Sequence, residues 1–242
     1  MNRLEICGFN NSTDAGPDKF GCSIFLKGCN LRCPYCMNSA LVNKKINVLS
    51  EEDILEKIAE DKSEWIFISG GEPTCTDEYD LCKFINSLKN NCKKVGMSTN
   101  GTKPEIICSI LQDLDYIAMD IKGNVRAYNT VSGKDGVCGS NLLMDVMNTW
   151  YMLREEKENR DFDYEIRSTV YPDFVNKEFI NFIGQFFIPK EKWIFQVYRP
   201  TNNMLDKSLD PNDVKDYEKM AKEIVKYAKA KYKDINISIR YV

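Results

Sequence analysis

The hydrophobic pattern of the chain alternates between short apolar runs and longer amphipathic segments. The apolar runs are rich in β-branched and aromatic residues, which is typical of buried strands, and the segments between them repeat apolar residues at helical spacing. The pattern predicts strands at 22–26, 65–68, 94–98, 116–120, 164–170 and 193–198, and helices at 51–61, 77–90, 103–113, 141–158 and 174–187.

The same alternation continues to the C-terminus with an amphipathic helix at 211–231 and a last strand at 235–241. Strands that alternate with helices favour a parallel sheet with helical crossovers. We therefore predict an α/β fold, a partial (β/α)6 TIM-type barrel with a C-terminal helix and strand, as one domain over residues 1–242. A doubly wound open sheet has the same rhythm, but both architectures place their sites at the carboxyl ends of strands. The glycine-containing stretch 124–140 reads as a loop.

Composition limits the classes of function. No apolar stretch is long enough to span a membrane, the first ten residues show no targeting signal, and the net charge of -3 comes without an arginine-rich segment. These features predict a soluble, cytoplasmic protein that binds neither membrane nor nucleic acid. Ten cysteines would be reduced in that compartment, so some are candidate metal ligands, and the absence of histidine removes the commonest general base.

Three of the cysteines share one loop after the first predicted strand. Cys29, Cys33 and Cys36 have Cys-x3-Cys-x2-Cys spacing. Thiolates suit zinc or iron-sulfur clusters, but a structural zinc site needs four ligands, and neither histidine nor a second Cys-x-x-Cys is present. Three thiolates on a four-iron cluster leave one iron open to an outside ligand, which indicates a reaction rather than a structural role. The other cysteines show no comparable spacing and read as small buried hydrophobes.

A glycine turn follows the second predicted strand. Ile68 runs into Ser69-Gly70-Gly71-Glu72-Pro73, where two glycines permit close backbone approach. Such a turn alone is as consistent with a plain connection as with a site.

Together, the cysteine loop, with Tyr35 directly before Cys36, and the Gly70-Gly71-Glu72-Pro73 turn resemble the radical S-adenosylmethionine (SAM) superfamily. The resemblance implies a [4Fe-4S] cluster on Cys29, Cys33 and Cys36 whose open iron chelates the amino and carboxylate groups of SAM. It also implies that Gly70, Gly71 and Glu72 line the cofactor's amino group and that the backbone of Tyr35 contacts its adenine.

Further segments match the superfamily at the ends of later strands: Ser98-Thr99-Asn100-Gly101, Met119-Asp120-Ile121-Lys122 and Arg167-Ser168-Thr169-Val170-Tyr171-Pro172. The carboxyl ends of parallel strands meet at one edge, so these side chains should converge. By resemblance, Asp120, Lys122 and Arg167 surround the cofactor's carboxylate and ribose with Ser98, Thr99 and Asn100 nearby, and Asp120 shares a monovalent cation. Some relatives have aspartate in place of Ser98 and a histidine where this chain offers Gln196, Tyr198 and Arg199.

Within the superfamily, these segments and the lead-in Asp14-Ala15-Gly16-Pro17 look most like glycyl radical enzyme activases, particularly the anaerobic ribonucleotide reductase activating proteins. That resemblance implies a radical SAM oxidoreductase, a glycyl radical enzyme as partner, and a low-potential electron donor such as flavodoxin or ferredoxin. Two alternatives stay open. One is an enzyme that acts on a small molecule and resembles 7-carboxy-7-deazaguanine synthases, with Glu165, Lys122 or Arg199 binding the substrate. The other is a zinc or electron-transfer module that is not an enzyme.

Overall fold

The computed structural model describes residues 4–16, 19–91, 93–133, 137–197, 200–201, 203–206, 208 and 214–241. Its strands are β1 (Ile6–Gly16), β2 (Lys19–Leu26), β3 (Trp65–Gly70), β4 (Lys94–Thr99), β5 (Tyr116–Asp120), β6 (Asp163–Val170), β7 (Lys192–Val197) and β8 (Asn236–Tyr241). The α-helices are α1 (Ser39–Val42), α2 (Glu51–Glu60), α3 (Glu78–Asn90), α4 (Pro104–Ile110), α5 (Val125–Val131), α6 (Gly139–Asn159), α7 (Lys177–Ile183) and α8 (Val214–Lys231). Short 3-10 helices in the described part of the chain include η1 (Pro73–Cys75), η2 (Leu111–Asp113) and η4 (Gly184–Phe186).

The strands form one sheet in chain order, from β1 to β8. Strands β2, β3 and β4 run parallel to one another, as do β6, β7 and β8, whereas β1 is antiparallel to β2. Sequential parallel strands with helical crossovers confirm the predicted α/β class of the partial barrel, ending in α8 and β8. Ser50 caps α2, since its side chain accepts from the Asp53 amide.

Strand β1 and helices α1 and α5 are among the elements that differ from the sequence prediction. Strand β1 was not predicted, because its polar run lacks the alternation that marks a half-buried strand, and its pairing with β2 is interrupted by register shifts. The predicted loop at 124–140 contains helix α5, so that assignment was wrong. The Asn124 side chain caps this helix by accepting from the Arg126 and Ala127 amides. The helix buries its own residues Tyr128 and Val131.

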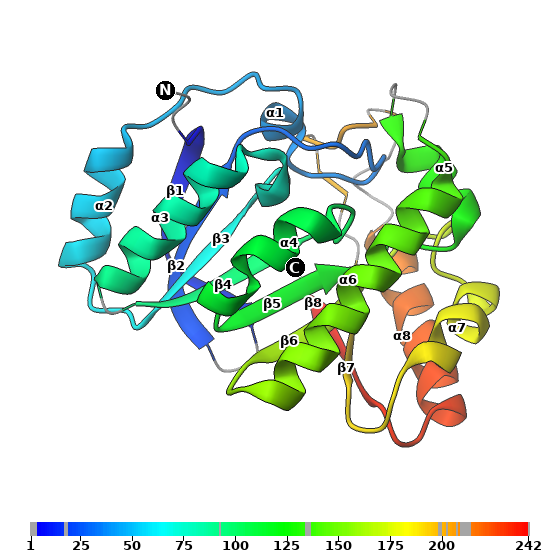
Figure 1. The fold of residues 1–242 in the computed structure, drawn as a ribbon. Helices are drawn as coiled ribbons and strands as arrows, with labels where there is room; N and C mark the ends of the chain where they lie inside the picture. The colour runs from blue at the N-terminus through cyan, green and yellow to red at the C-terminus, as the bar shows by residue number, and fades with distance from the viewer. Residues whose placement is uncertain are drawn as a thin grey trace. The chain divides into compact units, whose positions relative to one another are not determined.

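The chain divides into two compact units, each with its own core. Unit 1 comprises the described residues up to Asn30, with Ala40–Ala118 and Met147–Tyr164. In Figure 1, α3 and α4 lie across the face of β3 and β4. Buried side chains of the strands, such as Ile66 and Phe67, form its interior, and the Trp65 ring stacks on Phe67 with centroids 5.6 Å apart.

Unit 2 comprises Leu31–Ser39, Met119–Val146 and the described residues from Glu165 onward. Trp193 on β7 is fully buried, and its ring stacks against Phe187 at 4.5 Å and packs on Phe195 at 4.7 Å between centroids. Helix α8 contacts β7 and β8, so the C-terminal helix and strand belong to the body of this unit.

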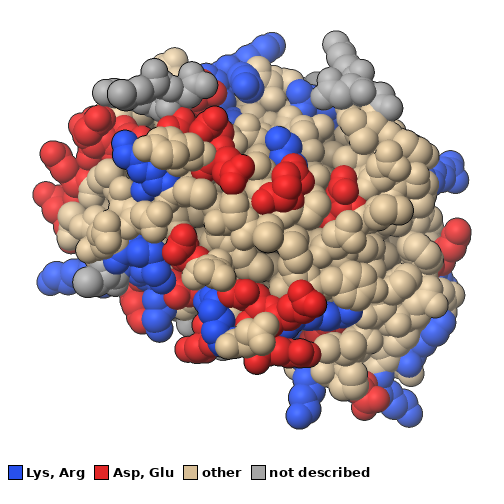
Figure 2. All heavy atoms as spheres, in the orientation of Figure 1, with Lys and Arg blue, Asp and Glu red and all other residues tan. Residues whose placement is uncertain are grey.

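Surface charge is mixed over the face shown in Figure 2. Acidic side chains are densest over α2, whose first turn contains Glu51, Glu52 and Asp53, with lysine and arginine interspersed. Acidic groups at a helix N-terminus interact favourably with its dipole. Among the described residues, we find no helix with the length and apolarity needed to span a membrane.

Candidate active site

The loops that follow β2 and β3 are joined through their backbones in unit 1. The Glu72 amide donates to the Gly28 carbonyl at 2.8 Å, and the Gly71 amide donates to the Leu26 carbonyl at 2.9 Å. A Cβ at Gly71 would lie 1.7 Å from the Gly28 oxygen, and Gly70 has φ of +120°, a conformation that other residues resist. Both glycines are therefore required for this backbone contact, and the turn is more than a plain connection.

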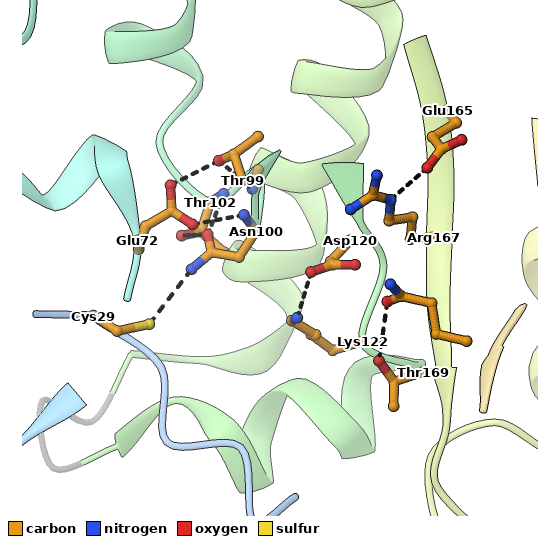
Figure 3. Close-up of polar contacts among 12 residues, drawn as sticks. Cys29, Glu72, Thr99, Asn100, Thr102, Asp120, Lys122, Glu165, Arg167 and Thr169 are labelled. Atoms are coloured by element: carbon orange, nitrogen blue, oxygen red, sulfur yellow. Dashed lines mark hydrogen bonds and ion pairs between the residues drawn. The ribbon is translucent and has the colours of Figure 1, made fainter. Parts of the chain in front are cut away.

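Glu72 ties the end of β3 to the end of β4. Its carboxylate is 1% exposed; Oε1 accepts from the Thr99 hydroxyl at 2.7 Å, and Oε2 accepts from the Asn100 amide at 2.6 Å (Figure 3). Thr74 donates to Oε1 from its amide at 3.1 Å and its hydroxyl at 2.8 Å. Burial raises the pKa of Glu72, and these hydrogen bonds offset the rise only in part.

The Asn100 side chain links this cluster to Cys29. Its Oδ1 accepts from the Thr102 amide at 3.0 Å and the Thr102 hydroxyl at 2.6 Å. Its Nδ2 donates to Asn30 Oδ1 at 2.9 Å and toward Cys29 Sγ at 4.0 Å (Figure 3). The Asn30 amide group in turn donates to the Thr102 hydroxyl at 2.7 Å. The first cysteine of the loop therefore faces a closed amide and hydroxyl network.

The remaining cysteines of the loop belong to unit 2. Cys33 and Cys36 close a turn in which the Cys36 amide donates to the Cys33 carbonyl at 3.0 Å. The loop is held by the Leu205 amide, which donates to the Cys36 carbonyl at 2.9 Å, and by the Asp206 amide, which donates to Pro34 at 3.0 Å. Burial raises the pKa of the Cys33 thiol to about 11, although the Lys122 ammonium opposes the rise. In metal-free protein, Cys33 is a protonated thiol at neutral pH.

The thiol of Cys138 lies in the opposite environment, which gives a testable contrast. Cys138 is exposed and its Sγ lies 3.0 Å from the Ser140 hydroxyl, an interaction that lowers its pKa. Because thiolates are the reactive form, we expect Cys138 in metal-free protein at mildly alkaline pH to alkylate on the order of 100-fold faster than Cys33. Mass spectrometry of iodoacetamide-treated protein measures both rates, and Ser140→Ala should slow Cys138 only. Equal rates at the two cysteines would contradict the buried placement of Cys33.

Asp120, the last residue of β5, forms an ion pair with Lys122. Lys122 Nζ lies 2.9 Å from Asp120 Oδ2, and the Lys122 amide donates to the Tyr128 hydroxyl at 3.2 Å. Burial lowers the pKa of Lys122, but the Asp120 carboxylate outweighs it, so the pKa stays well above its usual range. Asp120 Oδ1 is buried with no hydrogen-bond partner among the described residues. An unpaired buried carboxylate oxygen is costly unless a ligand group meets it.

Arg167 on β6 contacts a carboxylate of its own strand. Its Nε donates to Glu165 Oε1 at 2.5 Å, and Glu165 is fully buried. Arg240 on β8 donates to the same carboxylate through Nη1 at 2.6 Å and Nη2 at 3.1 Å. Burial favours a raised pKa for Glu165, but the two guanidinium groups outweigh it and the pKa falls below its usual value. Glu165 is thus already held by two arginines.

Three further candidate residues lie in the described part of the chain. The Tyr35 ring is buried, with centroids 5.1 Å from Tyr171 and 5.9 Å from Phe174. Gln196 on β7 accepts from the Thr169 hydroxyl at 3.4 Å, and Ser98 is half-buried near the end of β4. Tyr198 and Arg199 lie outside the described residues.

Sequence reasoning missed Asn30, Thr102 and Arg240. Their hydrogen bonds reach Asn100 or Glu165, but only Thr102 left a signal, an Asn-Gly-Thr turn directly after β4.

The donor chemistry of the loop fits an iron-sulfur cluster and its organic ligand. The chain has three thiols within eight residues of sequence and no histidine to favour zinc. It also has the Asp120 Oδ1 atom, which has no hydrogen-bond partner among the described residues. As the described residues lie, no group of three or more Cys, Asp and Glu side chains could hold a metal ion.

Similarity to known proteins supports the interpretation of the cysteine loop as an iron-sulfur site. The sequence profile of the Radical SAM superfamily matches residues 23–138. A Methanocaldococcus jannaschii protein, provisionally named a glycyl-radical enzyme activating enzyme, is 29% identical over 193 residues, which cover 78% of this chain and 77% of that protein. The 7-carboxy-7-deazaguanine synthase of Hyperthermus butylicus is 33% identical over 95 residues, only 37% of this chain and 39% of the synthase.

The fold is also similar to solved structures. Methylornithine synthase aligns with a TM-score of 0.54 at 10% identity, covering 90% of this chain and 70% of that one. Identity that low supports the fold alone. The cysteine loop, the Gly70-Gly71-Glu72 turn, the parallel α/β sheet and the sequence match agree, and residues 23–138 match the radical SAM superfamily.

Proposed function

We propose that this chain is a glycyl radical enzyme activase whose partner is of the anaerobic ribonucleotide reductase type. The observation that carries the proposal is the three-cysteine loop, joined at Gly28 to the Gly70-Gly71-Glu72 turn. The similarity to the Methanocaldococcus protein, which extends over 77% of its length, supports the activase class.

In this proposal, Cys29, Cys33 and Cys36 would hold a [4Fe-4S] cluster and leave one iron open to SAM. When bound, this pair supplies reductive cleavage of a carbon-sulfur bond to a 5'-deoxyadenosyl radical, with the electron coming from a flavodoxin or ferredoxin. The chain contributes chelation geometry, exclusion of water and docking of the target glycine, none of which requires histidine.

Each side chain has a proposed task. The bare backbone of Gly70 and Gly71 admits the cofactor's amino group, while Glu72 fixes the turn in place. The unpaired Asp120 Oδ1 accepts a ribose hydroxyl or coordinates a monovalent cation, and Lys122 neutralises Asp120. The other proposed cofactor-binding residues are Tyr35, Ser98, Thr99, Asn100, Arg167, Gln196 and Arg199.

The deciding test is the transfer of hydrogen from a partner's glycine. Reduced, reconstituted protein is incubated with SAM and an anaerobic ribonucleotide reductase, and electron paramagnetic resonance is used to detect a glycine-centred doublet. We expect the doublet with wild-type reductase, and its loss when the target glycine is replaced with alanine. SAM cleavage without a doublet for any glycyl radical enzyme would overturn the activase proposal while leaving the radical SAM assignment intact.

A second candidate is supported by the Hyperthermus match, which is a 7-carboxy-7-deazaguanine synthase. The sequence predicted Glu165 as a substrate ligand for such an enzyme. In the structure, however, both oxygens of Glu165 accept hydrogen bonds from Arg167 and Arg240. A small acidic substrate would therefore depend on Lys122 or an arginine. Chromatographic detection of 7-carboxy-7-deazaguanine after incubation with its precursor would favour this candidate.

A further inference from the structure

We propose that Asn100 donates an N–H hydrogen bond to the Cys29 sulfur and thereby raises the reduction potential of the cluster, and that Thr102 and Asn30 are positioning residues for this amide. The inference rests on the proposed function, in which Cys29 is a cluster ligand. It assigns to Asn100 an electronic role on the metal side, distinct from contact with SAM.

The orientation of the Asn100 amide is determined by its partners. Oδ1 accepts two hydrogen bonds from Thr102, one from the backbone amide and one from the hydroxyl. An oxygen must occupy that position, because the Thr102 backbone amide can only donate. The Nδ2 group is therefore directed the other way, toward Asn30 Oδ1 and Cys29 Sγ.

The two hydrogens of Nδ2 have two acceptors. One is used at 2.9 Å by Asn30 Oδ1, and the other points toward Cys29 Sγ at 4.0 Å. A thiolate bound to a metal is a stronger acceptor than a thiol, so this contact gains strength once Cys29 loses its proton. The pairing is therefore suited to a cluster-bound sulfur.

The amide is also held firmly. Asn100 and Thr102 are each 5% exposed, and the Asn100 backbone amide is bonded to the buried Glu72 carboxylate. Rotation of the side chain would break the Thr102 and Asn30 bonds together without water to replace them. A donor fixed in this way costs no reordering when the cluster changes charge.

Hydrogen bonds to the cluster sulfurs are one of the determinants of iron-sulfur potentials. Reduction adds negative charge to the cluster, and a fixed N–H stabilises that charge. Removing the donor should therefore shift the midpoint potential to a more negative value, making the cluster harder to reduce.

The test measures the midpoint potential of reconstituted protein by redox titration followed with electron paramagnetic resonance. Asn100→Leu removes the donor, and Thr102→Val removes one of the bonds that orient it, whereas Thr102→Ser keeps that bond. The matched control is Thr149→Val, because the Thr149 hydroxyl donates to the Gly101 carbonyl of the same loop at 2.8 Å without reaching Asn100 or Cys29.

We expect a negative shift for Asn100→Leu, a smaller one for Thr102→Val, and none for Thr102→Ser or Thr149→Val. Unchanged potentials in both Asn100→Leu and Thr102→Val would overturn the inference, as would an equal shift in Thr149→Val. If Asn100→Leu fails to assemble a cluster, Thr102→Val against Thr102→Ser decides. A wild-type protein that assembles no cluster would instead refute the proposed function.

Discussion

Replacement of Cys33 with alanine is expected to abolish the visible absorbance of the cluster after anaerobic reconstitution. The proposed site has only three protein ligands, so no other thiol of the Cys29–Cys36 loop can substitute. Cleavage of SAM should fall by more than about 100-fold, since metal sites lose substantial activity even when a partner outside the ligand shell is removed. Iron content, absorbance and release of 5'-deoxyadenosine are the measurements.

The matched control is Cys22→Ala on β2. Cys22 is also buried, and burial raises the pKa of its thiol to about 11, as it does for Cys33. This variant should lose some packing stability but retain the cluster, because its thiol is not a proposed ligand. Equal loss of iron in both variants would show that burial of a thiol, rather than ligation, explains the effect. Retention of iron and activity in Cys33→Ala would refute the three-cysteine site.

The sequence predicted the strands more reliably than the connections. Buried parallel strands are continuous apolar runs, so β5 was predicted with its observed boundaries and β7 began one residue before its predicted start. Edge strand β1 carries a polar run without alternating apolar residues, and its register shifts break any period. Helix α5 is only seven residues long and depends on its Asn124 cap and tertiary burial rather than on a long periodic stretch.

For the candidate site, motif spacing identified the residues that need a special type. A thiol at Cys29 and bare backbone at Gly71 have no substitutes, so they were visible in the sequence. Residues that orient others were missed, because Thr102 and Asn30 act only through contacts between the loops that follow β2 and β4. Arg240 reaches Glu165 across 75 residues of sequence, a separation at which spacing carries no information.

Replacement of Gly71 with alanine is expected to destabilise the fold as well as the site. The added Cβ would lie 1.7 Å from the Gly28 carbonyl oxygen and 2.5 Å from its carbon, both backbone atoms that cannot rotate away. The loops after β2 and β3 would have to separate, which breaks the Glu72 to Gly28 hydrogen bond. We expect a loss of about 3 kcal/mol in the free energy of unfolding. For a chain of this size that corresponds to a drop of roughly 6–12 °C in Tm.

Gly8→Ala on β1 is the matched control for this prediction. Its Cβ would approach Phe25 Cδ2 at 3.2 Å, and a phenyl ring can shift by a few tenths of an ångström where a backbone carbonyl cannot. We expect a change within about 1 kcal/mol, because a surface-strand substitution without a backbone clash is usually tolerated. Thermal unfolding of both variants, with cluster assembly measured in parallel, tests the pair. A Gly71→Ala protein as stable as Gly8→Ala would mean that the two loops are not in backbone contact, and the link between the cysteine loop and the glycine turn would then fail.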